Sequence, residues 1–218
     1  MKDSRYTMLF NKNILDIENG DYSFSDYFKM NIRTEDLVMS FGYRYALKEI
    51  CLAKQELPDS LNAWVDAFLS SYDQLRRLVN LTNEMAIREF LISPIIFELV
   101  KHYEVKVDIE SSVYYSQILR GNIDYILSKK NNFIAIEAKN ADMHRGLNQL
   151  LIELIALDKI VDKDDTPLYG VVTTGTEWNF SRLDRINKCI TQDRKSLYLS
   201  QDLTKIFQVI ISILDTPA

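Results

Sequence analysis

The first hundred residues carry apolar side chains at helical spacing. Residues 34–57 place them three or four apart, and Pro58 breaks the pattern before a wide apolar stripe over residues 61–81. This period of about 3.6 residues is that of an amphipathic helix. Residues 82–99 repeat it with Pro94 inside, and an internal proline kinks a helix or begins a new one. The pattern therefore predicts three helices, the last of them kinked.

After His102 the period changes from 3.6 to 2, which indicates β-strands. The strands predicted from this point on are residues 105–110, 113–119, 123–127, 133–138, 168–174 and 177–180. The predicted turns and loops are 121–122, 129–132 and 162–167, and the predicted helices are 143–161 and 200–215. This order indicates an α/β fold in which helices flank a mixed central sheet.

Composition narrows the class of protein. The 218 residues are 47% hydrophobic and 26% charged, which is typical of a soluble globular chain and excludes a disordered or collagen-like one. No apolar run reaches the roughly 18 residues of a membrane helix, and the start lacks the apolar segment of a signal peptide. Two cysteines, Cys51 and Cys189, make no disulfide framework and fit a reducing cytoplasm.

The charge balance excludes one kind of nucleic-acid binding. Lys and Arg number 26 and Asp and Glu number 31, so the net charge is −5. A protein that coats nucleic acid by bulk charge would be basic. Between residues 120 and 145, however, five basic side chains outnumber three acidic ones. Two of the three acids, Asp124 and Glu137, are the candidate metal ligands described below, and a bound divalent cation would offset their charge. We therefore expect nucleic-acid binding near this segment to be weak and to depend on a metal ion.

Three charged residues are candidates for chemistry. Glu137 and Lys139 share one face of a strand, and a short hairpin places the strand of Asp124 beside them. Buried charges are costly unless they pair or hold a metal. Two carboxylates suit Mg²⁺ or Mn²⁺, and a bound divalent ion can polarise a phosphodiester and acidify a water molecule.

A single acidic-x-Lys triplet is ordinarily only a solvated strand face. Residues 104–106 and 193–195 have the same pattern. The triplet at 137–139 differs because it ends the apolar strand 133–138, where exposed charges would serve no purpose for solubility. It is also preceded by Asp124 after a turn and followed by a helix.

Five segments in order resemble motifs of the PD-(D/E)XK nuclease superfamily, and more closely the N-terminal nuclease domain of type I restriction enzyme R subunits. The segments are Glu84–Pro94 (Glu-x-x-x-Arg-x-x-Leu-Ile-x-Pro), Asp124–Leu127 (Asp-Tyr-x-Leu), Ile136–Lys139 (Ile-Glu-Ala-Lys), Gly146–Gln149 (Gly-x-x-Gln) and Thr173–Phe180 (Thr-x-Gly-x-x-Trp-x-Phe). The chain has no Gly-x-x-x-x-Gly-Lys-Ser/Thr loop, so we expect no helicase motor in it. The resemblance implies a restriction-endonuclease-like αβββαβ core over residues 82–218 and a helical extension over residues 1–81.

The resemblance also implies a catalytic set. Asp124, Glu137 and the backbone carbonyl of Ala138 would hold Mg²⁺ or Mn²⁺. Lys139 would position or activate the attacking water. Glu84 would reach the metal through water or hold a second ion.

The remaining candidates are supporting residues. By resemblance, Gln149 would support the lysine or contact the scissile phosphate, although an exposed helix position is an equal alternative. Arg145, Lys129 and Lys130 are candidate nucleic-acid contacts, and a solvated Arg145 is an equal alternative. His144, seven residues after Glu137, is more consistent with a structural role than with a substrate contact.

The expected activity is metal-dependent hydrolysis of DNA phosphodiester bonds, and the sequence does not separate DNA from RNA. One alternative is a catalytically silent module of the same fold that binds nucleic acid or regulates a larger complex. Another places the function in the helices of residues 1–80. A homodimer through these helices is also predicted, with no membrane partner.

Overall fold

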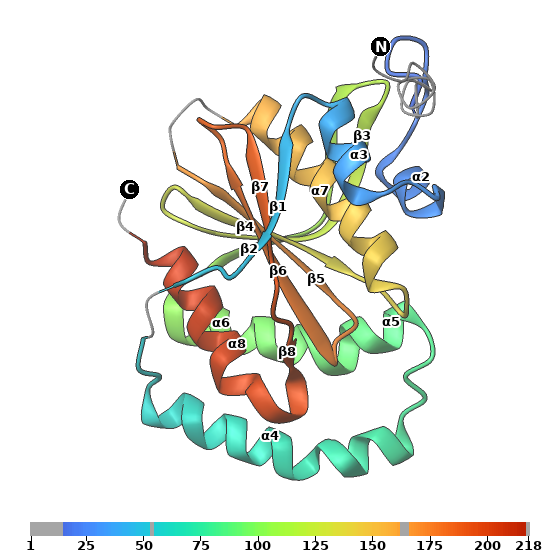
Figure 1. The fold of residues 1–218 in the computed structure, drawn as a ribbon. Helices are drawn as coiled ribbons and strands as arrows, with labels where there is room; N and C mark the ends of the chain where they lie inside the picture. Colours follow the sequence, from blue (N-terminus) through green and yellow to red (C-terminus); the bar gives the residue numbers. More distant parts are fainter. Residues whose placement is uncertain (1–14, 53–54, 162–165, 217–218) are drawn as a thin grey trace, which may run out of the picture.

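The computed structural model describes residues 15–52, 55–161 and 166–216 (Figure 1). The strands in these residues are β1 (Arg44–Lys48), β2 (Lys106–Ser116), β3 (Leu119–Lys129), β4 (Asn132–Ala138), β5 (Leu168–Thr173), β6 (Glu177–Asp184), β7 (Cys189–Asp193) and β8 (Leu197–Tyr198). The helices are α2 (Phe24–Lys29), α3 (Thr34–Ser40), α4 (Asp59–Leu78), α5 (Glu84–Ile87), the π-helical turn η1 (Arg88–Ile92), α6 (Ser93–Tyr103), α7 (Met143–Ile160) and α8 (Leu199–Leu214).

Within the described residues, the strands form one mixed sheet in the order β1-β7-β6-β5-β4-β3-β2, with β8 paired to β6. Strands β2, β3 and β4 are antiparallel neighbours, as are β5, β6 and β7. β4 and β5 are parallel and α7 connects them, because parallel neighbours need a long crossover. The predicted α/β class with a mixed, helix-flanked sheet is confirmed.

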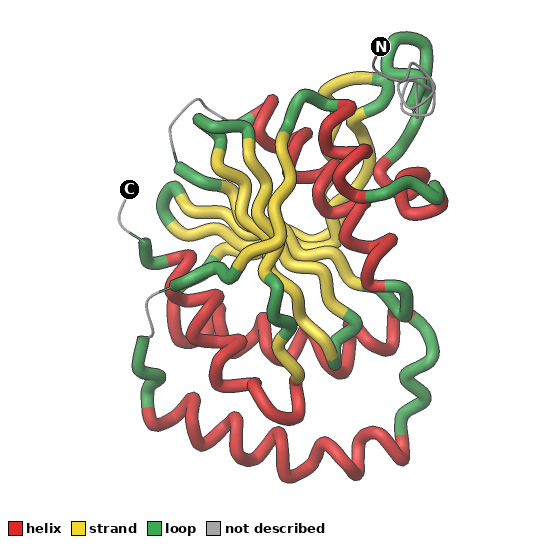
Figure 2. The backbone as a smooth tube through the Cα atoms, viewed as in Figure 1, coloured by secondary structure: helices red, strands yellow, loops and turns green. Residues whose placement is uncertain are grey.

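Helices cover both faces of the sheet (Figure 2). On one face, α4, α6 and α8 share an apolar core with Ile134 and Ile136 of β4. On the other, α2, α3 and α7 share a core with Ala135 of the same strand. The predicted alternation of side chains along this strand is therefore confirmed. None of the helices in the described part of the chain combines the length and apolarity that a membrane span requires.

Several predicted elements are confirmed close to their expected bounds. They are the helices over 61–81, 143–161 and 200–215, the strands over 123–127, 133–138 and 168–174, and the hairpin at 129–132. The predicted strand over 177–180 extends to Asp184, and β7 has no counterpart in the prediction. The predicted loop over 162–167 lies mostly outside the described residues.

The prediction of one helix over residues 34–57 is wrong. Helix α3 ends at Ser40, Gly42 adopts a φ of +81°, and residues 44–48 form β1. β1 pairs in parallel with β7, with Arg44 opposite Cys189. A stretch as short as residues 44–48 fits both the helical period of 3.6 and the strand period of 2. The strand that it pairs with lies far along the chain.

The turn predicted at Gly121-Asn122 is also wrong. The turn lies at residues 117–118, and the two strands predicted over 105–119 are one strand, β2. Gly121 lies within β3, where a Cβ atom would approach the Phe24 ring to 2.8 Å. A packing requirement rather than a turn explains this glycine.

Pro94 lies at the start of a new helix, as one of the two predicted alternatives, and a π-helical turn leads into it. The π-helical turn precedes it, and the Ser93 N–H donates to the Arg88 carbonyl. This wider turn places Pro94 in the first turn of α6, where its missing N–H is tolerated. π-Helical turns of this kind frequently occur at functional sites.

Residues before 82 contribute to both cores and to the sheet. β1 joins the sheet edge, α2 packs on α7, and α4 packs on α8. The apolar stripe of α4 that suggested a dimer surface is turned toward α8 of the same chain. These contacts cross the domain boundary expected at residue 81, and the segment before it is not wholly helical.

Candidate active site

A separation of two neighbouring strands creates the site. β3 and β4 pair as far as Tyr125 and Ile136, and beyond this point β4 continues beside β5 while β3 continues beside β2. The Ala138 N–H therefore lacks a β3 carbonyl and donates instead to Asp124 Oδ2 at 2.8 Å. The separation brings Asp124 to the end of β4, beside Glu137.

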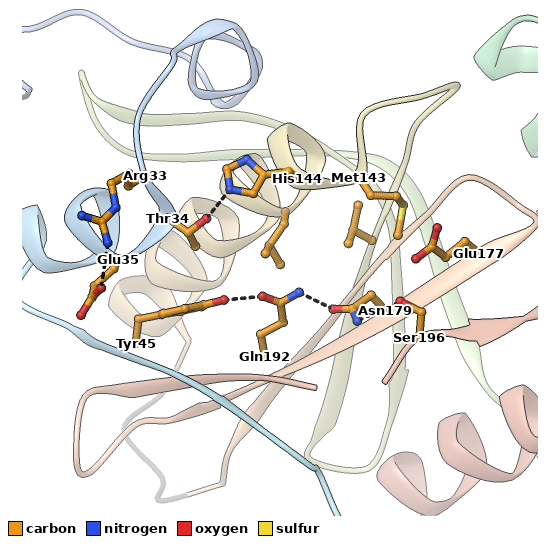
Figure 3. Close-up of a pocket in the computed structure, with 12 residues that line it drawn as sticks. Arg33, Thr34, Glu35, Tyr45, Met143, His144, Glu177, Asn179, Gln192 and Ser196 are labelled. Atoms are coloured by element: carbon orange, nitrogen blue, oxygen red, sulfur yellow. Dashed lines mark hydrogen bonds and ion pairs between the residues drawn. The ribbon is translucent and has the colours of Figure 1, made fainter. Parts of the chain in front are cut away.

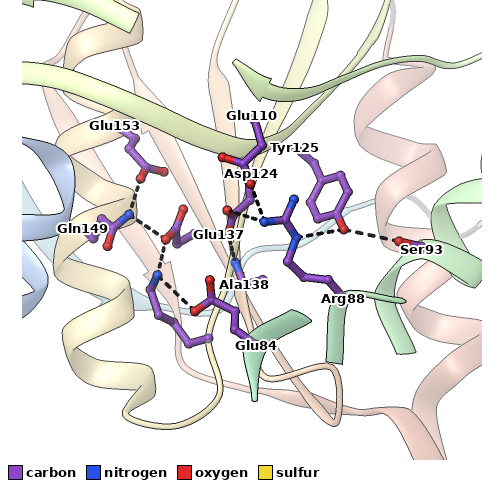
Figure 4. Close-up of polar contacts among 11 residues, drawn as sticks. Glu84, Arg88, Ser93, Glu110, Asp124, Tyr125, Glu137, Ala138, Gln149 and Glu153 are labelled. Atoms are coloured by element: carbon purple, nitrogen blue, oxygen red, sulfur yellow. Dashed lines mark hydrogen bonds and ion pairs between the residues drawn. The ribbon is translucent and has the colours of Figure 1, made fainter. Parts of the chain in front are cut away.

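Glu137 is the centre of the polar contacts (Figure 4). Its side chain is 2% exposed, and its Oε1 accepts hydrogen bonds from Lys139 Nζ and from Gln149 Nε2, the latter at 2.6 Å. Its Oε2 is buried and has no hydrogen-bond partner. The structure thus brings Asp124, Glu137, Lys139 and Gln149 together.

The first turn of α7 is placed by Gly146. A Cβ atom at this position would lie 2.8 Å from Lys139 Cγ and 2.9 Å from Val172 Cγ2. The absence of a side chain lets the helix approach β4 and β5 closely. Gln149 follows three residues later on the same helix face and so faces Glu137.

Glu84 lies at the opposite side of Lys139. It begins α5, whose N-cap residue Asn83 accepts a hydrogen bond from the Ala86 N–H at 2.8 Å. Glu84 Oε2 is 3.8 Å from Lys139 Nζ, and its side chain remains partly exposed. The ammonium group is therefore held between a buried and an accessible carboxylate.

Glu153 was not identified as a site residue from the sequence. It is 0% exposed, and its Oε1 accepts a hydrogen bond from Gln149 Nε2 at 3.0 Å. The sequence contains a signal for it, because α7 is apolar on nearly every side. A carboxylate inside such a helix needs a polar partner, and Gln149 is one turn away.

Arg88 is a second residue without an assigned role. Its Nη1 is 3.2 Å from Asp124 Oδ1 and also contacts Glu110, and its Nε donates to the Tyr125 hydroxyl at 3.2 Å. The guanidinium lies over the Tyr125 ring, 4.9 Å from its centroid. Arg88 therefore supplies a fixed positive charge to the Asp124 carboxylate.

Phe28 covers the lysine. Its ring centroid is 5.3 Å from Lys139 Nζ, within the range of a cation–π contact. Phe28 belongs to α2, which is more than a hundred residues away in sequence and packs on α7. No local pattern in the sequence connects it to the site.

Burial dominates the electrostatics of the carboxylates. It raises the pKa of Asp124, and with the charge of Glu153 it raises the pKa of Glu137 well above its ordinary value. Burial also raises the pKa of Glu153 to about 7. Burial alone would lower the pKa of Lys139, but the Glu137 carboxylate outweighs it and the pKa is raised. Lys139 is therefore a cation, and the buried environment disfavours two negative charges on Glu137 and Glu153.

The donor set suits a hard divalent ion. Within residues 15–52, 55–161 and 166–216, no three or more His, Cys, Asp or Glu side chains are arranged as a metal cluster. Mg²⁺, however, commonly uses one or two protein carboxylates and completes its coordination with water. Asp124 and Glu137 offer such a pair, and the unpartnered Glu137 Oε2 is an oxygen that a cation would satisfy.

The three predicted nucleic-acid contacts lie in two separate places. Arg145 lies in the first turn of α7, partly exposed, with its Nε 3.2 Å from Asp142 Oδ2. Lys129 and Lys130 lie at the β3–β4 hairpin, at the opposite end of β4 and about 20 Å from Glu137 at the usual rise of a strand. Lys129 Nζ is 2.6 Å from Asp215 Oδ1. Of the three, only Arg145 lies on α7 next to Gly146, which packs against Lys139.

Trp178 and Phe180 are buried in the core, as expected for structural residues.

Comparisons with protein families, with curated proteins and with solved structures find no match to this chain. The geometry of the site and the sequence motifs are therefore the basis for any functional conclusion.

Proposed function

We propose that the chain is a metal-dependent nuclease that hydrolyses DNA phosphodiester bonds. The observation that carries the proposal is the convergence of Asp124, Glu137 and Lys139 where β3 and β4 separate. Glu137 there retains a buried oxygen with no donor. A merely structural salt bridge would not require a second carboxylate or leave this oxygen unsatisfied.

The order of elements supports the proposed restriction-endonuclease-like core. Helices α5 and α6 are followed by β2, β3 and β4, then by α7 and β5. This is the αβββαβ order expected from the motifs. The candidate residues lie on β3, β4 and the two flanking helices, and this grouping also supports the proposal.

Each residue has a distinct part in the proposed chemistry. Asp124, Glu137 and the Ala138 carbonyl would hold Mg²⁺ or Mn²⁺, and Glu84 would approach it through water. When bound, the ion would polarise the phosphodiester and lower the pKa of a water molecule. Lys139, a cation held by Glu137, would orient that water or stabilise developing negative charge.

Gln149 and Arg145 would support these steps. Gln149 fixes the rotamer of Glu137 through its 2.6 Å hydrogen bond. Arg145 reaches a phosphate only if it leaves Asp142, and in this arrangement it would anchor the backbone of the substrate.

The test is cleavage of plasmid DNA, linear DNA and RNA with Mg²⁺, Mn²⁺ or EDTA. We expect DNA cleavage that requires the metal and decreases at least about a hundredfold in Asp124→Asn and Lys139→Ala. Lys130→Ala is the matched control, because it removes a lysine at the far hairpin. Absence of cleavage with every metal and substrate, or equal cleavage by the site variants, would reject the proposal.

A catalytically silent binding module is the second candidate. The observation that favours it is Arg88, whose guanidinium already neutralises Asp124 as a metal would. Such a module would bind nucleic acid in EDTA as tightly as in Mg²⁺ and would cut nothing. A nuclease would bind more tightly with the metal, so electrophoretic mobility shifts in both buffers separate the two.

Two further parts of the proposal concern context. The free thiols of Cys51 and Cys189 are consistent with a reducing cytoplasm. A homodimer would let two sites cut two strands, and light scattering over a range of protein concentrations tests it.

A further inference from the structure

A cavity of about 380 Å³ (Figure 3) is lined in part by the first turn of α7, the helix that also carries Gln149 of the candidate active site. The first turn of α7 and the start of α3 form one side of it. Strands β1, β5, β6 and β7 form the other. Its rim is exposed at Arg33, Glu35 and His144, and its floor is formed by Asn179 and Gln192. The volume is at the lower end of the range of small-molecule sites, so it suits one small ligand rather than a duplex.

The sheet register connects this floor to Glu137. Glu137 on β4 is paired with Val172 on β5, and Val172 is paired with Asn179 on β6. Side chains at paired positions lie on the same face of a sheet. Neighbouring strands are about 4.8 Å apart, so the backbone at Asn179 is about 10 Å from that at Glu137. The cavity and Glu137 therefore lie on the same face of the sheet, on either side of Val172 and the first turn of α7 that packs on it.

The floor presents a hydrogen-bond donor beside an acceptor. The Tyr45 hydroxyl donates to Gln192 Oε1, and Gln192 Nε2 donates to Asn179 Oδ1 at 3.0 Å. Asn179 Nδ2 donates to the Asp193 carbonyl at 3.0 Å. An amide has two N–H groups and two oxygen lone pairs. One N–H of Gln192 and one lone pair of Asn179 therefore remain, and a donor next to an acceptor matches the edge of a nucleobase.

The charge of the cavity disfavours a phosphate. Among the described residues that line it, Arg33 is the one Lys or Arg, and its Nη2 is 3.6 Å from Glu35 Oε2. Glu177 adds a second carboxylate to the lining. Carboxylates and amide oxygens accept hydrogen bonds from amino groups such as those of cytosine and adenine. The chemistry therefore favours a neutral ligand that carries an amino group.

We propose that this cavity binds the nucleobase of the nucleotide next to the scissile phosphate, with a preference for bases that carry an exocyclic amino group. The position next to a scissile phosphate rests on the proposed nuclease function. The binding of a base does not, because it uses the neutral floor of the cavity and no metal.

The first experiment measures nucleoside binding in EDTA by ligand-detected NMR. We expect adenosine, cytidine or guanosine to bind wild type at about millimolar Kd, as befits a small ligand, and more tightly than thymidine. Gln192→Leu should lose this binding at least fivefold, whereas the control Gln201→Leu, exposed on α8, should retain it. His144→Trp, which narrows the exposed rim, provides a second variant if the first does not fold. No binding by wild type, or equal binding by the cavity variants, would overturn the base site.

The second experiment uses single-stranded oligonucleotides with one abasic position at a time. At one position next to the cut, loss of the base should lower kcat/KM of wild type about tenfold. The same loss should change Gln192→Leu less than twofold, because that variant has already lost the contact. A wild-type enzyme that cuts every abasic substrate equally would overturn the placement beside the scissile phosphate. Nucleoside binding without any cleavage would retain the base site and reject the nuclease.

Discussion

One amide nitrogen joins the carboxylates of Glu137 and Glu153. Gln149 Nε2 is 2.6 Å from Glu137 Oε1 and 3.0 Å from Glu153 Oε1, while the second oxygen of each carboxylate is buried without a partner. Two buried acids with one shared donor cannot both be ionised at low free-energy cost. The pair therefore responds to pH and to any bound cation.

The pH dependence of stability tests this pair. The pKa of Glu153 is about 7 in the folded protein and about 4.5 when unfolded, so between these values the folded state binds more protons. The stabilisation that protonated Glu153 provides is thus fully present below pH 4.5. It is lost as pH rises through about 7, which lowers the free energy of unfolding by roughly 3 kcal/mol. Glu153→Gln should reduce the measured loss by the share of Glu153, and the raised pKa of Glu137 should leave a smaller one. Urea unfolding in EDTA from pH 4.5 to 8 measures it, with Asp66→Asn on the exposed face of α4 as control.

Arg88 should oppose metal binding because its charge occupies the same carboxylate. Arg88→Met removes the ion-pair partner of the buried Asp124 and leaves only the charge of Lys139 nearby, so the metal-free variant should be less stable than wild type. Mn²⁺ should bind this variant more tightly, by about tenfold, because no fixed cation repels it. Calorimetric titration with Mn²⁺ compares it with Arg77→Met on α4. Equal or weaker Mn²⁺ binding by Arg88→Met would show that Arg88 does not compete with the ion.

Gly146 should not tolerate a methyl group, although alanine is the better helix former. The added Cβ meets Lys139 and Val172 below 3 Å, and overpacking of this kind costs about 1–3 kcal/mol. The gain in helix propensity is at most about 1 kcal/mol. Gly146→Ala should therefore lower the free energy of unfolding by about 1 kcal/mol and displace Lys139. Chemical denaturation and a cleavage assay check both effects, and a more stable variant with full activity would contradict the close approach.

Glu84 should matter less than Lys139. Its carboxylate is 3.8 Å from the ammonium group and partly exposed, so its loss leaves Glu137 in place to hold Lys139. Glu84→Gln should reduce cleavage about tenfold and raise the Mg²⁺ concentration for half-maximal activity. Glu89→Gln, an exposed carboxylate one turn away, should change neither. A hundredfold loss in Glu84→Gln would instead make it a direct metal ligand.

The core of the site could be predicted from local patterns. A period of two places Glu137 and Lys139 on one face, a short hairpin brings the strand of Asp124 alongside, and helical spacing turns Gln149 toward them. Each of these relations spans fewer than thirty residues. Local periodicity and turn chemistry determine such relations directly.

The rest of the site depends on contacts between distant segments. Phe28 reaches Lys139 from α2, and Arg88 reaches Asp124 from 36 residues earlier in the chain. The strand at residues 44–48 fell inside a predicted helix, and its partner, β7, comes 145 residues later. No periodicity within one segment contains information of this kind.

That late pairing has a consequence for the order in which the molecule assembles. During synthesis, Arg44 must wait for Cys189 before the sheet edge can close, and Phe28 must wait for α7. Contacts between distant residues slow folding because a long loop is closed before they form. The segments that carry Phe28 and Arg44 thus dock only after the later elements that they contact have been made. Phe28 can cover Lys139 only after α7 has been made, so this cover is added after the strands that carry Asp124 and Glu137.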